Sequence, residues 1–139
     1  MNRLKFILQA KNQYGIHSPF LFKLYEEVVA PRLGVRKCRS CGISVWRSYD
    51  KLLYKIKDHY GAEPISTDSG FTGADAVLRL PDGTDVVLVK YPHRTKSIEE
   101  AWHSLTDDQR VTLSVDLFHT GLAFTSPRLA RQHILLRPF

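Results

Sequence analysis

The chain has 139 residues, of which 43% are hydrophobic and 24% are charged. This composition is typical of one globular domain and excludes a disordered chain. No apolar run approaches the roughly 18–20 residues that a membrane-spanning helix needs. Residues 1–9 also lack the apolar core and the cleavage site of a signal peptide. We therefore expect a single domain over residues 1–139 that resides in the cytoplasm and has no membrane partner.

The charge is mildly basic, since 20 Lys and Arg residues face 14 Asp and Glu residues for a net charge of +6. Such an excess favours phosphate-bearing or acidic partners through long-range attraction. The basic residues are scattered along the chain and do not gather into one run. Nucleic-acid binding is therefore the less favoured interpretation of the charge.

The first third of the chain predicts two helices. Residues 1–16 predict a short helix followed by a polar stretch. A longer helix begins at Ser18-Pro19, because Ser18 can cap the helix and Pro19 suits its first position. Apolar residues then recur every three to four positions until about Ala30, and Pro31 ends the helix.

A single C-x-x-C pair, Cys38 and Cys41, lies in the basic and irregular stretch 31–47. Two thiolates supply half of a tetrahedral zinc site, and the sequence has no second pair, so no metal site is expected. The neighbouring basic residues favour the thiolate form, which keeps a redox pair open as an alternative. Two inert thiols remain the favoured interpretation.

A further helix is predicted over residues 49–60, with Ser48 as its cap and Gly61 as its end. Two apolar segments follow, residues 76–80 and 86–89, and the linker between them contains Asp-Gly. This pattern predicts a β-hairpin. The second segment is apolar at every position, which indicates a strand in the middle of a sheet.

The last part of the chain predicts one more helix and three strands. Ser97 and Glu100 have the spacing of a capping box, which predicts a helix that begins at Ser97. Its inner face is expected to consist of Ile98, Ala101, Trp102 and Leu105. Residues 111–117 alternate like a half-buried strand, which points Asp116 outward, either into solvent or onto a basic neighbour. Residues 122–125 should pair back onto that strand, and residues 133–137 should form a terminal strand.

These elements predict an α/β fold with a small mixed sheet and N-terminal helices. Residues 1–61 form the helical part of the domain, and residues 74–139 form the sheet with one crossing helix.

Five segments together resemble bacterial class I S-adenosylmethionine-dependent methyltransferases of the O-methyltransferase-like kind. The first is Gly15-Ile16-His17-Ser18-Pro19-Phe20, which is similar to an element that precedes the catalytic core of the family. The other segments match a helix before the first core strand, the stretch after the fifth strand, the last hairpin and the terminal strand: residues 51–60, 93–102, 111–124 and 133–139. The resemblance implies an incomplete Rossmann-like methyltransferase fold.

The middle of the sequence departs from this family. The glycine-rich cofactor loop has only a remnant in Asp68, Gly70 and Gly73, and no apolar strand precedes it. Where the family carries two acidic residues after its fifth strand, this chain has Lys90-Tyr91. The resemblance therefore implies an internally deleted relative that lacks the cofactor-binding half and needs no cofactor. Exposed strand edges in such a remnant predict a homodimer.

The sequence thus favours a non-catalytic binding or interaction module. One alternative is an S-adenosylmethionine-dependent methyltransferase with a reduced site, or with a site completed by a partner chain. A second alternative is a nuclease of the PD-(D/E)xK kind, with Asp75 before one strand and Lys90 after the next, although Leu88 stands where a further acid is expected. His17, Ser18, His93 and Asp116 are the other candidate binding residues, and His93 is singled out because it follows a strand end.

Overall fold

The structure is a computed structural model that describes residues 1–10, 19–29, 48–65, 71, 73–129 and 131–136. Over these ranges the chain forms a mixed sheet of six strands in the order β1-β2-β3-β5-β4-β6. The strands are β1 (Glu63–Ile65), β2 (Ala76–Arg79), β3 (Asp85–Lys90), β4 (Leu113–Asp116), β5 (Thr120–Phe124) and β6 (Gln132–Leu135). The α/β class and the small mixed sheet are therefore confirmed.

Four of the five strand pairings are antiparallel, and β4 with β6 is the parallel pair. The predicted hairpin is present as β2 and β3, and the predicted return strand is present as β5. Because β5 runs antiparallel to both β3 and β4, these two strands point the same way. Their carboxyl ends consequently meet at one edge of the sheet.

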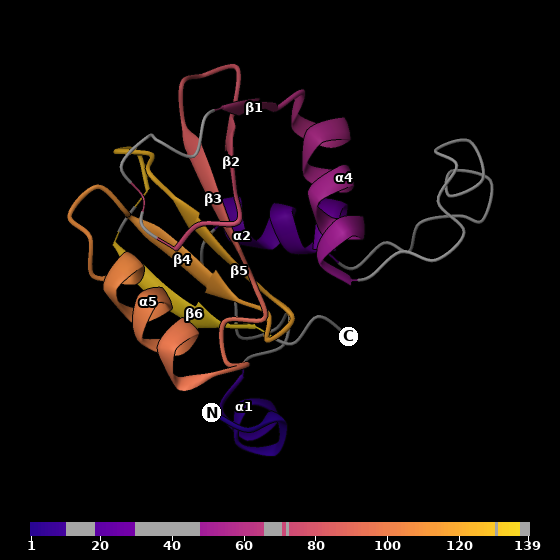
Figure 1. Ribbon diagram of the computed structural model, residues 1–139. Helices are drawn as coiled ribbons and strands as arrows, with labels where there is room; N and C mark the ends of the chain where they lie inside the picture. Colours follow the sequence, from indigo (N-terminus) through magenta and orange to yellow (C-terminus); the bar gives the residue numbers. More distant parts are fainter. Residues whose placement is uncertain (11–18, 30–47, 66–70, 72, 130, 137–139) are drawn as a thin grey trace.

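Helices cover both faces of this sheet (Figure 1). One face carries α5 (Lys96–Thr106), and the opposite face carries α2 (Pro19–Leu24), the π-helical turn η2 (Tyr25–Val29) and α4 (Ser48–Tyr60). The short helix α1 (Arg3–Gln9) lies beyond the edge where α5 begins. None of the helices in the described ranges is both long and apolar enough to cross a membrane.

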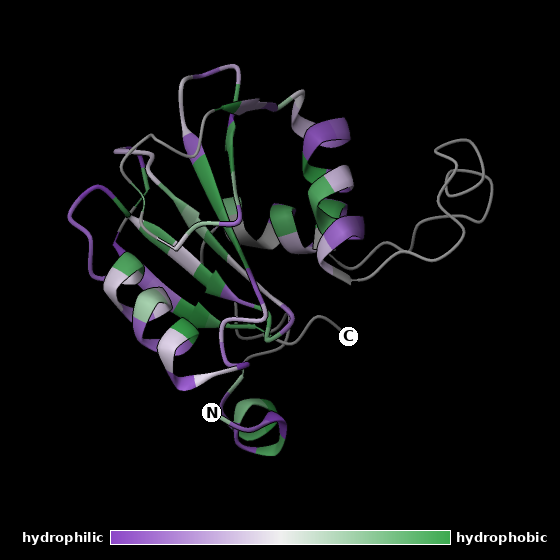
Figure 2. Cartoon of the chain, in the orientation of Figure 1, coloured by the Kyte–Doolittle hydropathy of each residue, from purple (hydrophilic) through white to green (hydrophobic). Residues whose placement is uncertain are grey.

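The strand β3 separates two hydrophobic cores. Val86 and Leu88 pack with α2, η2 and α4, whereas Val87 and Val89 pack with Trp102 and Leu105 of α5. Figure 2 shows the hydrophobic residues gathered along the central strands and the inner helix faces. This two-sided burial explains why the sequence of β3 is apolar at consecutive positions and confirms its central place.

Burial on both faces of the sheet also corrects the prediction for β4. Residues 111–117 alternate in sequence, yet every residue of β4 is buried. The second face is closed by α5, so Ser114 and Asp116 are buried beside it although they are polar. The prediction that Asp116 points into solvent was therefore wrong.

Two helix boundaries and one strand also differ from the prediction. The cap of α5 is Thr95, whose hydroxyl accepts a hydrogen bond from the Ile98 backbone, and Ser97 lies inside the helix. The second predicted helix changes to π-helical hydrogen bonding at Tyr25. The strand β1 was not predicted, because Pro64 reads as a strand breaker; Pro64 is accommodated here because β1 is the edge of the sheet.

Trp102 sits so close to β5 that only glycine fits at position 121. A Cβ atom added to Gly121 would lie 2.7 Å from Cη2 and Cζ3 of the Trp102 ring. The ring is fully buried, so it has little room to move away. Gly121 is thus required by the close approach of a side chain.

We predict that Gly121→Ala lowers the free energy of unfolding by about 1–3 kcal/mol, the usual cost of overpacking a core. Chemical denaturation measures this change. The same alanine substitution is then made in the Trp102→Phe variant, whose smaller ring leaves space for the added methyl group. The Trp102 Nε1 atom has no hydrogen-bond partner among the described residues, so this replacement breaks no hydrogen bond there. An alanine penalty of the same size in both backgrounds would contradict the steric explanation.

Candidate functional site

A buried ionic cluster of His93, Glu99 and Asp116, here called the histidine cluster, lies at the edge where β3 and β4 end. The His93 Nδ1 atom lies 2.5 Å from a Glu99 carboxylate oxygen, and its Nε2 atom is hydrogen-bonded to the Asp116 carboxylate. The side chains of His93 and Asp116 are only 2% and 1% exposed. His93 and Asp116 are therefore shielded from solvent, whereas Glu99 lies partly exposed at the rim of the cluster.

Each member of the histidine cluster comes from a different element. His93 belongs to the turn after β3, in which the Arg94 backbone N–H donates to the Tyr91 carbonyl at 3.0 Å. Glu99 lies in the first turn of α5, and Asp116 is the last residue of β4. The cluster therefore joins the ends of two strands and the start of the helix between them.

Aromatic rings enclose the imidazole. Phe118 stacks on His93 with a centroid separation of 5.9 Å and an interplanar angle of 24°. Phe6 of α1 lies 6.1 Å from His93 and 5.2 Å from Phe118. The second Asp116 oxygen accepts a hydrogen bond of 2.9 Å from the Phe118 backbone, which holds the stacking ring in place.

The two carboxylates favour the charged form of His93. Burial by itself lowers the pKa of His93, but the hydrogen bonds and charges of Asp116 and Glu99 outweigh it and hold the pKa above its ordinary value. The amino group of Met1 donates to Glu99 at 2.6 Å. This hydrogen bond has the largest effect on Glu99 and the hydrogen bond from His93 the next largest, and together they lower the pKa of Glu99 to about 2.

This arrangement restricts what His93 can do chemically. A general base needs a ring nitrogen that can reach a substrate proton. Both ring nitrogens of His93 are occupied by carboxylates, and the ring faces Phe118 and Phe6. The histidine cluster is therefore suited to hold the surrounding elements together.

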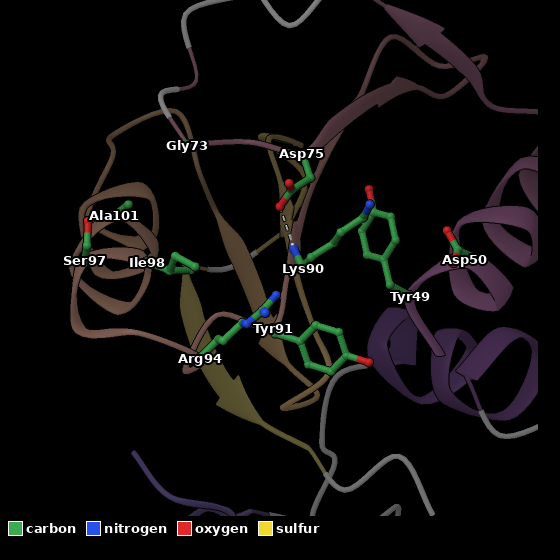
Figure 3. Close-up of a pocket in the computed structure, with 10 residues that line it drawn as sticks. All are labelled: Tyr49, Asp50, Gly73, Asp75, Lys90, Tyr91, Arg94, Ser97, Ile98 and Ala101. Atoms are coloured by element: carbon green, nitrogen blue, oxygen red, sulfur yellow. Dashed lines mark hydrogen bonds between the residues drawn. The ribbon is translucent and has the colours of Figure 1, made fainter. Parts of the chain in front are cut away.

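A cavity of about 520 Å³, here called the polar cavity, lies beside the histidine cluster (Figure 3). It opens between β3, α4 and α5. Its lining is rich in charged and aromatic side chains: Tyr49, Asp50, Gly73, Asp75, Lys90, Tyr91, Arg94, Ser97, Ile98 and Ala101.

The charged groups of the polar cavity are held by local contacts. The Lys90 ammonium lies 4.8 Å from the centroid of the Tyr49 ring, which is a cation–π distance. An Asp75 carboxylate oxygen accepts a hydrogen bond of 2.7 Å from the Lys90 backbone N–H. Burial, with the nearby charges of Asp75 and Asp50, raises the pKa of Tyr49, so its hydroxyl stays protonated.

The structure brings together some of the residues predicted from sequence. His93 and Asp116 are direct partners, and Gly73 lines the neighbouring polar cavity. His17, Ser18, Asp68 and Gly70 lie outside the described residues, as do Cys38 and Cys41.

Sequence reasoning missed Glu99 and Arg94. Glu99 lies between the two residues of the predicted capping box, yet it is the second carboxylate of the histidine cluster. Arg94 directly follows His93 and lines the polar cavity. The signal in the sequence was a histidine after a strand end, with Arg94 directly behind it and Glu99 six residues further on.

The residues of the nuclease alternative also lie side by side, since Asp75 contacts the Lys90 backbone. Leu88, at the position of the missing acid, is fully buried in the core. Over the described ranges, no group of three or more His, Cys, Asp or Glu side chains is arranged to hold a metal ion. The geometry does not favour this alternative.

Comparison of the chain with known proteins found no matching family model, no matching curated protein and no matching solved structure.

We predict that His93→Gln destabilises the protein most between about pH 4.5 and 6.5, where His93 and Glu99 are both charged. Because the pKa of His93 is raised in the folded state, its contribution is complete below about 6.5 and is lost as the pH rises through the folded pKa. The difference in unfolding free energy between wild type and variant should therefore be about 3 kcal/mol near pH 6 and should shrink in alkali. Urea denaturation at a series of pH values measures it.

His103→Gln is the matched control, because His103 is exposed on α5. It should change the free energy of unfolding only slightly. Burial, and next the charge of Lys55, lower the pKa of His119 to about 4. The contribution of His119 to stability therefore changes with pH in the opposite direction. It is common to both proteins and cancels in the difference. A His93→Gln effect that grows toward alkaline pH would contradict the charged state assigned here.

Proposed function

We propose that this chain is a methyltransferase-like binding module without catalytic activity, and that it holds a small polar ligand in the polar cavity. The observation that carries the proposal is the polar cavity itself, which combines Lys90, Arg94 and two tyrosines at the carboxyl end of β3. Ligands of α/β proteins bind in crevices outside the carboxyl ends of strands. A volume of about 520 Å³ lies within the usual range of small-molecule sites.

The absence of catalysis is supported by the way the neighbouring acid–base groups are used. His93 directly precedes Arg94, which lines the polar cavity, and both ring nitrogens of His93 bind carboxylates. Asp75 is held by the Lys90 backbone, and Lys90 lies over the Tyr49 ring. Charged groups fixed in this way suit recognition of a ligand better than proton transfer.

The order of the elements supports the methyltransferase-like part of the proposal. The resemblance expects a strand, a helix, a hairpin and a terminal strand over the second half of the chain. The strand β3, the helix α5, the β4–β5 hairpin and the strand β6 occur in that order. The sheet edge next to β2 is occupied by the short strand β1.

One observation favours an S-adenosylmethionine-dependent methyltransferase as the second candidate. Gly73, a remnant of the expected cofactor loop, lines the same cavity as Lys90 and Tyr91. Its φ of +81° is a conformation that glycine adopts readily, and such backbone can approach a ligand closely. A reduced cofactor site would therefore coincide with the polar cavity.

Amide chemical-shift mapping with three probes tests the proposal: inorganic phosphate, adenosine monophosphate and S-adenosylmethionine. We expect at least one probe to shift the Gly73, Lys90 and Ser97 amides at millimolar concentration or below. Lys90→Met should weaken this binding about tenfold, because it removes a charge and keeps the length of the side chain. Lys57→Met, on the exposed side of α4, is the control and should bind like wild type.

No shift at these amides with any probe would contradict the binding module. Micromolar binding of S-adenosylmethionine together with methyl transfer to a small hydroxyl acceptor would overturn the non-catalytic assignment in favour of the second candidate.

A further inference from the structure

A second cavity of about 410 Å³ adjoins the polar cavity and is lined by Tyr91, His93, Arg94 and Phe118. We call it the aromatic cavity. It shares Tyr91 and Arg94 with the polar cavity, so these two residues form the boundary between them. Three of its four lining residues carry flat rings, whereas the polar cavity is lined by charged groups of both signs.

The backbone around the aromatic cavity is strained. In the described part of the chain, Tyr91 (φ 41°) and Phe118 (φ 70°) are the non-glycine residues with a left-handed φ. Bulky residues rarely adopt this conformation, which is unfavourable and is concentrated at binding and catalytic sites. Both strained residues line the aromatic cavity.

Hydrogen bonds hold both residues in these conformations. The Tyr91 N–H donates to the His119 carbonyl at 3.0 Å, and the Phe118 N–H donates to Asp116 at 2.9 Å. The fold therefore maintains two unfavourable backbone conformations, and each one places an aromatic ring at the same cavity.

We propose that the aromatic cavity binds a planar aromatic anion, with its ring against Phe118 and Tyr91 and its carboxylate or phosphate on Arg94. This inference rests on the proposed binding function and names the class of ligand. The groups around the cavity are fixed before the ligand arrives, which lowers the entropic cost of binding.

The ring preference follows from what the walls offer. Phe118 is stacked on His93, and both ring nitrogens of His93 are occupied. His93 thus supports Phe118 from behind, while Phe118 and Tyr91 line the cavity with their rings, and aromatic pairs gain attraction beyond simple burial. A volume of about 410 Å³ accommodates a one- or two-ring system.

The anion preference follows from the position of Arg94. Its guanidinium is exposed at the boundary of the two cavities, and a planar fork of donors matches a carboxylate or a phosphate. Arg94 is the basic residue that lines the aromatic cavity, whereas Asp50 and Asp75 line only the polar cavity. Arg94 is thus the place where the charged end of the ligand belongs.

The experiment compares 2-naphthoate with two probes that each lack one feature, the neutral 2-naphthalenemethanol and the non-aromatic cyclohexanecarboxylate. Amide shifts and titration calorimetry measure the binding. We expect 2-naphthoate to bind about tenfold tighter than either partial probe and to shift the Tyr91, Arg94 and Phe118 amides.

Arg94→Gln should reduce the affinity for 2-naphthoate about tenfold and leave that for 2-naphthalenemethanol unchanged, whereas Arg128→Gln at the opposite sheet edge should change neither. Tyr91→Asn removes the ring and keeps a residue that tolerates a left-handed φ, and it should weaken both naphthyl probes. Shift mapping on the wild-type protein gives a readout that does not depend on the folding of this variant.

Equal binding of 2-naphthoate and cyclohexanecarboxylate, or an unchanged affinity in Arg94→Gln, would overturn the inference. Binding of phosphate or adenosine monophosphate at Lys90, with no naphthyl probe at Phe118, would overturn this inference and leave the proposed function in place. If no probe shifts either cavity, both are overturned.

Discussion

The charged contact between His93 and its two carboxylates determines how the carboxyl edge of the sheet is built. Asp116 is almost completely buried, and a buried carboxylate is strongly unfavourable unless it is paired and hydrogen-bonded. His93 supplies the charge, and the Phe118 N–H supplies a further hydrogen bond. Once these bonds are made, the turn after β3, the first turn of α5 and the end of β4 have fixed relative positions.

Fixing the turn after β3 also fixes the residues on either side of His93. His93 points inward to Asp116, whereas Tyr91 and Arg94 line the two cavities. A single buried side chain therefore positions two residues that line the cavities. The strain at Tyr91 and Phe118 is consistent with this view, because a rigid edge can hold conformations that a free turn would leave.

The sequence predicts those parts of the fold that depend on local chemistry. Asp-Gly between two apolar segments identifies the β2–β3 hairpin, and the continuous apolar run of β3 identifies a central strand. The prediction for Asp116 failed because alternation along a strand does not reveal whether a helix covers its second face. The helix cap lies two residues before the predicted one, because Thr95 also carries a hydroxyl and this hydroxyl accepts a hydrogen bond from the Ile98 backbone.

The candidate site was less predictable than the fold. His93 and Glu99 are six residues apart and Asp116 is 23 residues from His93, so no local pattern relates the three. What brings them together is that β3 and β4 point the same way on either side of β5, with α5 as the connection. This β3–α5–β4 unit makes the edge rigid and charged, because its histidine is bonded at both ring nitrogens. The same unit holds Tyr91 and Arg94 at the two cavities, so the geometry of the cavities depends on a histidine that is already fully bonded.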